Sequence, residues 1–370
     1  MMNTPSRHVQ VSAPGRVCLF GEHQDYLQLP VVPCAISLRI TIEGWRSDGN
    51  DALLHLPDIG AEESFPLGRP SAYTKKRDYL RSAVNIVLRR GYTFRSGIEA
   101  TVKGEIPINA GTSSSSALIV AWVALLLRLS DQDTILPPAD IALLAHEAEV
   151  REFGEPGGMM DHFSSAIGGV LAIEFSPTVT LAGLKASLGT FVLGDSGEPK
   201  DTTEILARVK NQVLEISTDL QRRFPEFSLH TVAANDLARY TTHLEPEQRE
   251  LLQGTLRNRD LTRIARTELD KSPLNHRRIG ILLNEHQHIL RDVLRISTPK
   301  IDRMLVAAMT AGAYGGKING SGGGGCMFAY APDDPDRVAR AVEGAGGRAY
   351  VVSMDEGVHV EEFHTEKTHP

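Results

Sequence analysis

The feature that most constrains the fold is a run of small residues that leads directly into an apolar helical stretch. Ala110 to Ser116 contains four serines in succession, and Ala117 to Leu129 is the apolar stretch that follows. The first N–H groups of a helix have no intrahelical partner and its N-terminus is partially positive, so such a start suits an anion such as phosphate. One serine would suffice as a simple N-cap. Four in succession favour an anion-binding site.

Length and composition predict a folded protein with room for two domains. The chain has 370 residues, of which 41% are hydrophobic and 23% charged, a balance typical of globular proteins. Its net charge of −7 would repel nucleic acid and anionic membrane surfaces. We therefore expect neither as a partner, and an anionic ligand would need a local cluster of donors.

Cysteine usage and the apolar segments indicate a cytoplasmic protein. Cys18, Cys34 and Cys326 form no CxxC motif, as is typical of buried thiols in a reducing compartment. The N-terminus has no apolar stretch of signal-peptide length. The most apolar segment, Ala117 to Leu127, is shorter than a membrane span requires.

The periodicity of apolar residues predicts an α/β protein whose texture changes near residue 185. Strands and helices alternate up to Phe175, with Pro14-Gly15 predicted as a turn. Beyond the change, long charged helical stretches reach to about Arg295. The sequence therefore predicts an N-terminal domain over residues 1–185 and a C-terminal domain over residues 186–370.

Two further features receive structural interpretations. His286 and His288 lie in the sequence NEHQHIL without an evident third ligand, so we expect helix-surface residues rather than a zinc site. Residues 361–370 are polar and terminal, and we expect them to form a frayed tail.

Two more segments contain glycines beside chemically active residues. The first is APGRVCLFGEHQDY, Ala13 to Tyr26, and the second is GGKINGSGGGGC, Gly315 to Cys326. Neither is a Walker A motif, because Lys317 is followed by Ile318. The GxGxxG letters of the second segment precede an extended apolar run instead of a helix, which excludes a dinucleotide fingerprint. Its glycines predict a close approach of backbone to ligand.

These segments resemble the motifs of the GHMP kinases, the family that includes galactokinases, homoserine kinases and mevalonate kinases. Ala13 to Tyr26 is similar to the galactokinase signature GRxNLIGEHxDY, and Ala148 to Ser165 to the galactokinase stretch AENxFxGxxCGIMDQFxS. Ile106 to Leu118 and Gly315 to Cys326 resemble the second and third motifs of the wider family. All four occur in the family's order.

The resemblance implies a two-domain GHMP kinase fold. Its N-terminal domain is α/β and ribosomal protein S5 domain 2-like, and its C-terminal domain is ferredoxin-like. ATP and a sugar are expected in the cleft between them. The boundary near residue 185 agrees with this plan.

The resemblance also implies roles for residues of Ala13 to Tyr26 and of Ala148 to Ser165. Asp161 would be the catalytic base, and Arg16 would neutralise the transferring phosphoryl group and keep Asp161 ionised. Without the resemblance, Asp161 could be a helix cap and Arg16 a surface residue in a turn. Sugar hydroxyls would be bound by Glu22, His23, Asp25 and Gly158.

Nucleotide binding is expected from Ile106 to Leu118 and Gly315 to Cys326, and metal binding from Ile106 to Leu118 together with Ala148 to Ser165. The Mg²⁺ ligands would be Ser115 and Glu149, although Glu149 could equally be a solvated residue at the edge of its helix. Lys317 could be a solvated charge, or could help with phosphate. ATP would contact Gly111, Thr112, Ser113, Ser114, Ser115, Ser116 and Lys317.

Departures from galactokinases concern the sugar pocket. Cys18 replaces an asparagine of the signature, and Leu27-Gln28-Leu29 replaces the usual Asn-Gly-Gly. A galactokinase run that supplies a sugar-binding tyrosine is replaced by DSGEPKDTTEIL. The expected acceptor is thus galactose or a related sugar, such as arabinose, an N-acetylhexosamine or a uronic acid, and the expected product is a sugar 1-phosphate.

Two alternatives remain at this point. A non-catalytic ATP and sugar sensor could have the same fold, although the presence of both Asp161 and Arg16 favours an enzyme. A mevalonate-type kinase is the other. The polar side chains of GEHQDY exceed what a mostly apolar acid with few hydroxyls would need.

Overall fold

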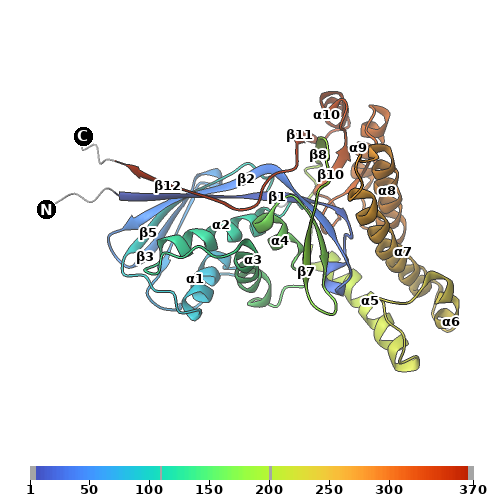
Figure 1. Cartoon of the computed structure of the whole chain (residues 1–370), viewed down its shortest axis with the longest axis horizontal. Coiled ribbons are helices and arrows are strands. Elements are labelled where there is room, and N and C mark those ends of the chain that lie inside the picture. The colour runs from blue at the N-terminus through green and yellow to red at the C-terminus, as the bar shows by residue number, and fades with distance from the viewer. Residues whose placement is uncertain (1–5, 109–110, 200–201, 366–370) are drawn as a thin grey trace.

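The protein, described here by a computed structural model over residues 6–108, 111–199 and 202–365, is built on two β-sheets with helices packed against them. The larger sheet has eight strands and the smaller has four. Figure 1 shows the larger sheet with helices α1 to α4 along one face, and the helices of the second half of the chain gathered at its far end.

The larger sheet is organised around two long antiparallel strands, β1 (Ser6–Phe20) and β2 (Val32–Ser47). Its strand order is β12-β1-β2-β5-β3-β4, with β6 pairing β2 and β7 pairing β6. The remaining strands are β3 (Asp51–Leu56), β4 (Ala61–Pro66), β5 (Gly97–Gly104), β6 (Val170–Glu174), β7 (Thr180–Leu184) and β12 (His359–Thr365).

Pro14-Gly15 is a bulge within β1 rather than the predicted turn. The register between β1 and β2 shifts between Pro14 and Gly15, and the strand continues to Phe20. A bulge bends a strand and re-aims the side chains that follow it. The continuing half of β1 therefore reaches into the second half of the molecule, where Val17 and Leu19 join the second hydrophobic core.

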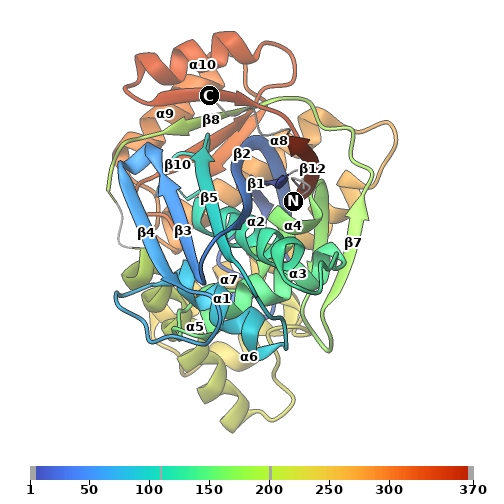
Figure 2. The same cartoon turned by 90° about the vertical axis from the view of Figure 1, so that its left-hand side faces the viewer.

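The helix expected from the small-residue run forms the centre of the first core. Helix α2 (Ser114–Leu129) is apolar on nearly all sides, and such a helix must be covered all round. It packs against β1, β2, α1 (Tyr79–Arg89), α3 (Pro138–His146) and α4 (Met160–Ile167). Figure 2 shows α1, α2 and α3 packed together beside the strands.

The second half combines the smaller sheet with longer helices. The sheet order is β11-β8-β10-β9, all antiparallel, from β8 (Phe191–Asp195), β9 (Gly315–Ile318), β10 (Cys326–Tyr330) and β11 (Arg348–Val352). The helices are α5 (Thr202–Arg223), α6 (Leu237–Thr241), α7 (Pro246–Leu269), α8 (His276–His288), α9 (Pro299–Thr310) and α10 (Pro335–Gly344). None of the described helices combines the length and apolar character of a membrane span.

The chain crosses from the larger sheet to the smaller one between β7 and β8, and then returns. Strand β12 pairs with β1 along Ser6 to Ser12, so the prediction of a frayed tail is wrong for residues 361–365; residues 366–370 lie outside the described part. We propose the crossing near residue 185 as the domain boundary, with β12 belonging to the N-terminal domain.

His286 also differs from its predicted surface position. It is fully buried, and its ring stacks on Phe20 with centroids 5.9 Å apart. Burial lowers the pKa of His286 well below its ordinary value. His288, two residues later, is exposed as expected.

Candidate active site

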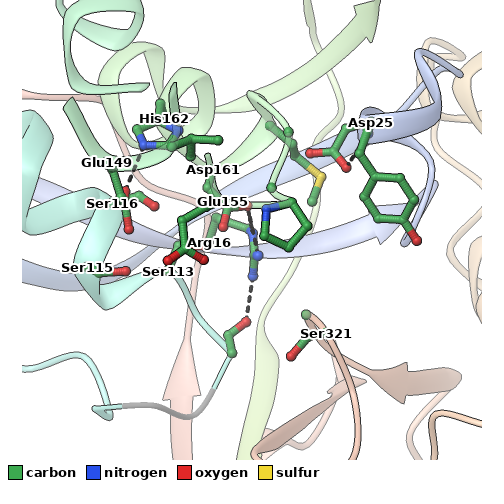
Figure 3. Close-up of a pocket in the computed structure, with 18 of the residues that line it drawn as sticks. Arg16, Asp25, Ser113, Ser115, Ser116, Glu149, Glu155, Asp161, His162 and Ser321 are labelled. Carbon is green, nitrogen blue, oxygen red and sulfur yellow. Dashed lines mark hydrogen bonds and ion pairs between the residues drawn. The ribbon is translucent and has the colours of Figure 1, made fainter. Parts of the chain in front are cut away.

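A cavity opens between the end of β1, the start of α2, the loop before α4 and the glycine loop after β9, and residues at the start of α1 and on the turn after α3 complete its lining (Figure 3). Nearly all of the predicted site residues line it, although they come from distant parts of the sequence. They are Arg16, Glu22, His23, Asp25, Gly111, Ser113, Ser114, Ser115, Ser116, Glu149, Gly158 and Asp161. Thr112 and Lys317 lie outside the lining.

The start of α2 presents free backbone donors to the cavity. Ser113 stands at the N-cap position with a left-handed φ of 61°, and its side chain makes no capping hydrogen bond. The first N–H groups of the helix are therefore left for another acceptor. This arrangement suits a phosphate group. Ala110, the first residue of the predicted phosphate-binding run, lies outside the described residues.

The bulge in β1 brings Arg16 against this phosphate-binding loop. The backbone N–H of Arg16 donates to the carbonyl oxygen of Thr112 at 3.1 Å. Thr112 is completely buried, so it contributes this backbone contact rather than a group in the cavity. A Cβ on Gly15 would lie 2.8 Å from the same oxygen, which explains the glycine. The Arg16 side chain then donates through Nη1 to Gly111 O at 2.6 Å.

Arg16 and Asp161 form an ion pair at the cavity wall. Nε and Nη2 of Arg16 both lie 2.8 Å from Oδ1 of Asp161. Burial alone would raise the pKa of Asp161, but the charge of Arg16, together with the Ser113 hydroxyl, outweighs it and lowers that pKa. Asp161 is consequently ionised at neutral pH. Its side chain keeps 30% exposure, so the carboxylate remains accessible from the cavity.

Glu149 lies on a widened turn that continues α3. Residues Glu147–Arg151 form a π-helix, a feature frequent at functional sites. The Glu149 carboxylate accepts a hydrogen bond from Nε2 of His162 at 2.7 Å (Figure 3). Burial would raise the pKa of Glu149, but His162 and the hydroxyls of Ser115 and Ser116 lower it. An ionised carboxylate beside serine hydroxyls is a set of hard oxygen donors.

Asp25 occupies the opposite end of the cavity. It opens the short 3₁₀ helix Asp25–Leu27, and its Oδ1 accepts the backbone N–H of Tyr26 at 2.8 Å. A Cβ on Gly158 would lie 2.1 Å from Oδ2, so this contact requires glycine. Burial, followed by the charge of Asp161, raises the pKa of Asp25 to about 6. Among the described residues, no cation pairs with this carboxylate.

His23 is held in one orientation beside Asp25. Its backbone has a left-handed φ of 63°. Nε2 donates to the carbonyl oxygen of Ser321 at 3.0 Å, which leaves Nδ1 to accept from the Tyr26 hydroxyl at 2.7 Å. Burial lowers the pKa of His23, so the ring is neutral and its tautomer is set by these two partners.

Lys317 differs most from its predicted role. Its ammonium donates to Glu22 Oε2 at 2.7 Å, and the two side chains are 0% and 3% exposed. A phosphate in the cavity would have to break this enclosed pair to reach the ammonium. The expectation that Lys317 contacts ATP therefore does not fit its position, and the pair also withdraws one oxygen of Glu22 from a sugar.

Several cavity residues escaped the sequence interpretation. His162 directly follows Asp161, and a search for partners of Glu149 could have found it. Arg77 and Glu155 form a bidentate ion pair across the rim, at 2.8 Å and 2.9 Å. Because 78 positions separate them, no local pattern indicates this contact. Tyr26, Tyr79 and Ser321 are among the other lining residues that were missed.

Family models match three parts of the chain. The GHMP kinase N-terminal domain matches residues 78–169 and the GHMP kinase C-terminal domain residues 266–348. The galactokinase galactose-binding signature matches residues 3–44. These ranges include the start of α2, the glycine loop and the end of β1 described above.

Relatives over the full length fall into two groups. Mevalonate kinase of Thermococcus sibiricus is 30% identical, covering 96% of this chain and 99% of the relative. Galactokinase of Actinobacillus succinogenes is 28% identical, with 95% and 94% covered.

Solved structures of both kinds share the fold. Lactococcus lactis galactokinase complexed with galactose superposes with a TM-score of 0.84, at 22% identity and 95% coverage of each chain. Methanococcus jannaschii mevalonate kinase gives a TM-score of 0.68 at 18% identity, with 94% of this chain and 99% of that chain covered. From the full-length relatives, the family-model matches and the cavity, the chain belongs to the GHMP kinases and is an ATP-dependent phosphotransferase.

Proposed function

We propose that this protein is a sugar kinase that transfers the γ-phosphoryl group of ATP to a monosaccharide hydroxyl. The expected acceptor is the C1 hydroxyl of galactose or of a related sugar. The observation that supports this most is Asp25, a carboxylate facing the cavity without a described cation partner. Neutral hydroxyl donors satisfy such an acceptor, whereas an anionic acceptor molecule would be repelled by it.

The proposed transfer uses the two ends of the cavity together. The nucleotide phosphates lie at the start of α2, and the sugar lies between Asp25 and Asp161. Asp161 takes the proton of the sugar hydroxyl as its oxygen bonds to the γ-phosphorus. The bond from that phosphorus to the β–γ bridging oxygen breaks, and ADP leaves. Arg16 stabilises the negative charge of the transferring group and keeps Asp161 ionised.

Glu149 and Ser115 are the residues that would hold Mg²⁺. Their oxygens suit this cation, which binds through one or two protein groups together with substrate phosphates. No cluster of three or more acidic, histidine or cysteine residues capable of holding a metal occurs in the described chain, so an all-protein cage is not the expected arrangement. The cation, when bound, would neutralise phosphate charge.

A mevalonate kinase is the second candidate. It is favoured by the mevalonate kinase relatives, at 30% identity for that of Thermococcus sibiricus. The acceptor would then be an anion and would need a cation in the cavity. Arg16 and Arg77 line it, but both are already paired with carboxylates. Because both arginines already pair with carboxylates, the charges of the cavity favour a neutral sugar over mevalonate as the acceptor.

An acceptor panel tests the proposal. The protein is incubated with ATP and Mg²⁺ and with galactose, arabinose, N-acetylhexosamines, uronic acids or mevalonate, and ADP release is followed. We expect at least one neutral sugar to be phosphorylated faster than mevalonate. Turnover of mevalonate alone would establish the second candidate, and turnover of no acceptor would favour a sensor. We also propose a cytoplasmic location, consistent with the three free buried cysteines.

A further inference from the structure

Strand β9 and the loop after it contact β1 and the residues that follow β1. The Lys317 ammonium pairs with Glu22, and the carbonyl oxygen of Ser321 accepts from His23. Asn319 lies between them and contacts the backbone on either side of Val17. Of these three residues Ser321 lines the cavity, whereas Lys317 and Asn319 are not among its lining residues and contact Glu22 and the β1 backbone.

Asn319 uses both ends of its amide in these contacts. It is 0% exposed. Its Oδ1 accepts the backbone N–H of Cys18 at 2.8 Å, and its Nδ2 donates to the carbonyl oxygens of Gly111 at 2.8 Å and Arg16 at 3.4 Å. The oxygen faces a donor and the nitrogen faces acceptors, so the orientation of the amide is determined by its partners.

Gly111 O is the point where these contacts meet the catalytic pair. It accepts from Asn319 Nδ2 and also from Arg16 Nη1, at 2.8 Å and 2.6 Å. Arg16 in turn holds Asp161. Asn319 thus fixes both the backbone from which Arg16 extends and the carbonyl oxygen that its guanidinium contacts. Its contact with Arg16 joins residues 303 positions apart in the chain.

Other side chains could not replace this amide. An aspartate has acceptors on both ends and would face the carbonyl oxygens of Gly111 and Arg16 without a proton to donate. A serine could reach one partner but not all of them. Burial makes these losses costly, because a buried backbone group that loses its partner cannot form a hydrogen bond with water instead.

We propose that Asn319 is a positioning residue for phosphoryl transfer: from the loop after β9 it sets the placement of Arg16, and through Arg16 the placement of the Asp161 carboxylate. The inference rests on the proposed function, in which Arg16 and Asp161 act on the transferring group. Displacement of a catalytic group by about 1 Å can reduce a rate on the order of 100-fold.

The test is Asn319→Ala, assayed with the acceptor that the wild-type enzyme phosphorylates fastest. We expect kcat to fall about 10- to 100-fold. Because Arg16 lowers the pKa of Asp161, its displacement raises that pKa, and the acid limb of the pH dependence of kcat moves to higher pH. In the Arg16→Lys background the same substitution should cost much less than in the wild type, since both act through one group.

Asn284→Ala is the matched control. Asn284 accepts the backbone N–H of Gly316 on β9, the strand that leads to Asn319, but is not among the cavity residues. The Asn284→Ala variant should be less stable, whereas the acid limb of its pH dependence of kcat should not shift. If Asn319→Ala does not fold, Asn319→Ser replaces it in the same assays.

A loss of kcat with an unmoved acid limb, or full additivity with Arg16→Lys, would overturn the positioning role. Failure of the proposed function would appear separately, as a wild-type enzyme that phosphorylates no sugar.

Discussion

Two ion pairs near the same cavity have similar geometry but different surroundings. Arg16–Asp161 and Lys317–Glu22 have closest distances of 2.8 Å and 2.7 Å. The carboxylate of the first pair is 30% exposed toward the cavity, whereas both members of the second are at most 3% exposed. Exposure, and not the presence of a charged pair, distinguishes a group that can meet a substrate from one that fixes the scaffold.

The two halves of the molecule contribute differently to the cavity. The N-terminal half supplies the groups that face the cavity. The glycine-rich segment of the C-terminal half supplies Lys317 and Asn319, which hold the end of β1 from behind. Gly320 and Ser321 do reach the lining. The segment therefore combines a wall of the cavity with a support for the catalytic residues.

The largest expected effect comes from the exposed pair. Asp161→Asn removes the proton acceptor, and we expect phosphoryl transfer to fall on the order of 10⁴-fold, or about 5 kcal/mol in the barrier. ATP affinity should change little, because the start of α2 is intact. A coupled assay and nucleotide titration measure the two quantities. Asp219→Asn, at a partly exposed position of α5, is the control and should remain active. Most activity remaining in Asp161→Asn would refute the role of Asp161 as base.

Disruption of the enclosed Lys317–Glu22 pair should instead lower the stability of the protein. Lys317→Met leaves the Glu22 charge buried without compensation, and we expect a loss of about 3 kcal/mol in the free energy of unfolding. Adding Glu22→Gln should restore most of it. Urea denaturation measures both variants. An unchanged unfolding midpoint for Lys317→Met would contradict the structural role of the pair.

Asp25 provides a pH-dependent effect of intermediate size. Its folded pKa of about 6 lies above the ordinary value of about 3.9, so the folded state binds this proton more tightly. Its contribution to stability therefore falls as pH rises from about 4 through 6.

Asp25→Asn should thus raise the free energy of unfolding by about 1 kcal/mol at pH 8, after allowance for partial exposure, and by little at pH 4. It should also raise KM for the sugar. Denaturation at the two pH values and sugar titration test this. Lower stability at pH 8 together with an unchanged KM would exclude the proposed role of Asp25.

The smallest effect is expected at the rim. Arg77 and Glu155 are 40% and 17% exposed, and pairs of this kind contribute about 0.5 kcal/mol. Arg77→Gln should therefore change the free energy of unfolding by no more than about 1 kcal/mol. If Arg77→Gln lowered the free energy of unfolding as much as Lys317→Met, side-chain exposure would not explain the difference between these ion pairs.

The candidate site could be predicted largely because much of its chemistry is local in sequence. The start of α2 and the residues of GEHQDY each lie in one short segment, and the structure brings them to one cavity. The function of Lys317 could not be predicted, because its partner Glu22 lies 295 positions away. Lys317 could be a solvated charge, a phosphate ligand or a member of a structural ion pair, and its burial, which appears only in the folded structure, decides between these roles.

The glycines of Gly315 to Cys326 illustrate the same limit. Their number predicted a close approach to a ligand. A Cβ on Gly320 would lie 2.7 Å from Gly111 O, and one on Gly322 would lie 2.5 Å from Ile296. These two glycines therefore accommodate protein atoms. The return of β12 to the first sheet was missed for a related reason, since strand pairing between the two ends of a chain leaves no local pattern.

The most direct test of the central claim is a competition followed by ³¹P NMR. Wild-type enzyme is given ATP, Mg²⁺ and an equimolar mixture of the best sugar of the panel and mevalonate, beside an Asp161→Asn reaction. We expect a sugar phosphate resonance to dominate with the wild type and to be nearly absent with the variant. Mevalonate phosphate as the dominant product, or equal sugar phosphate from both enzymes, would contradict it.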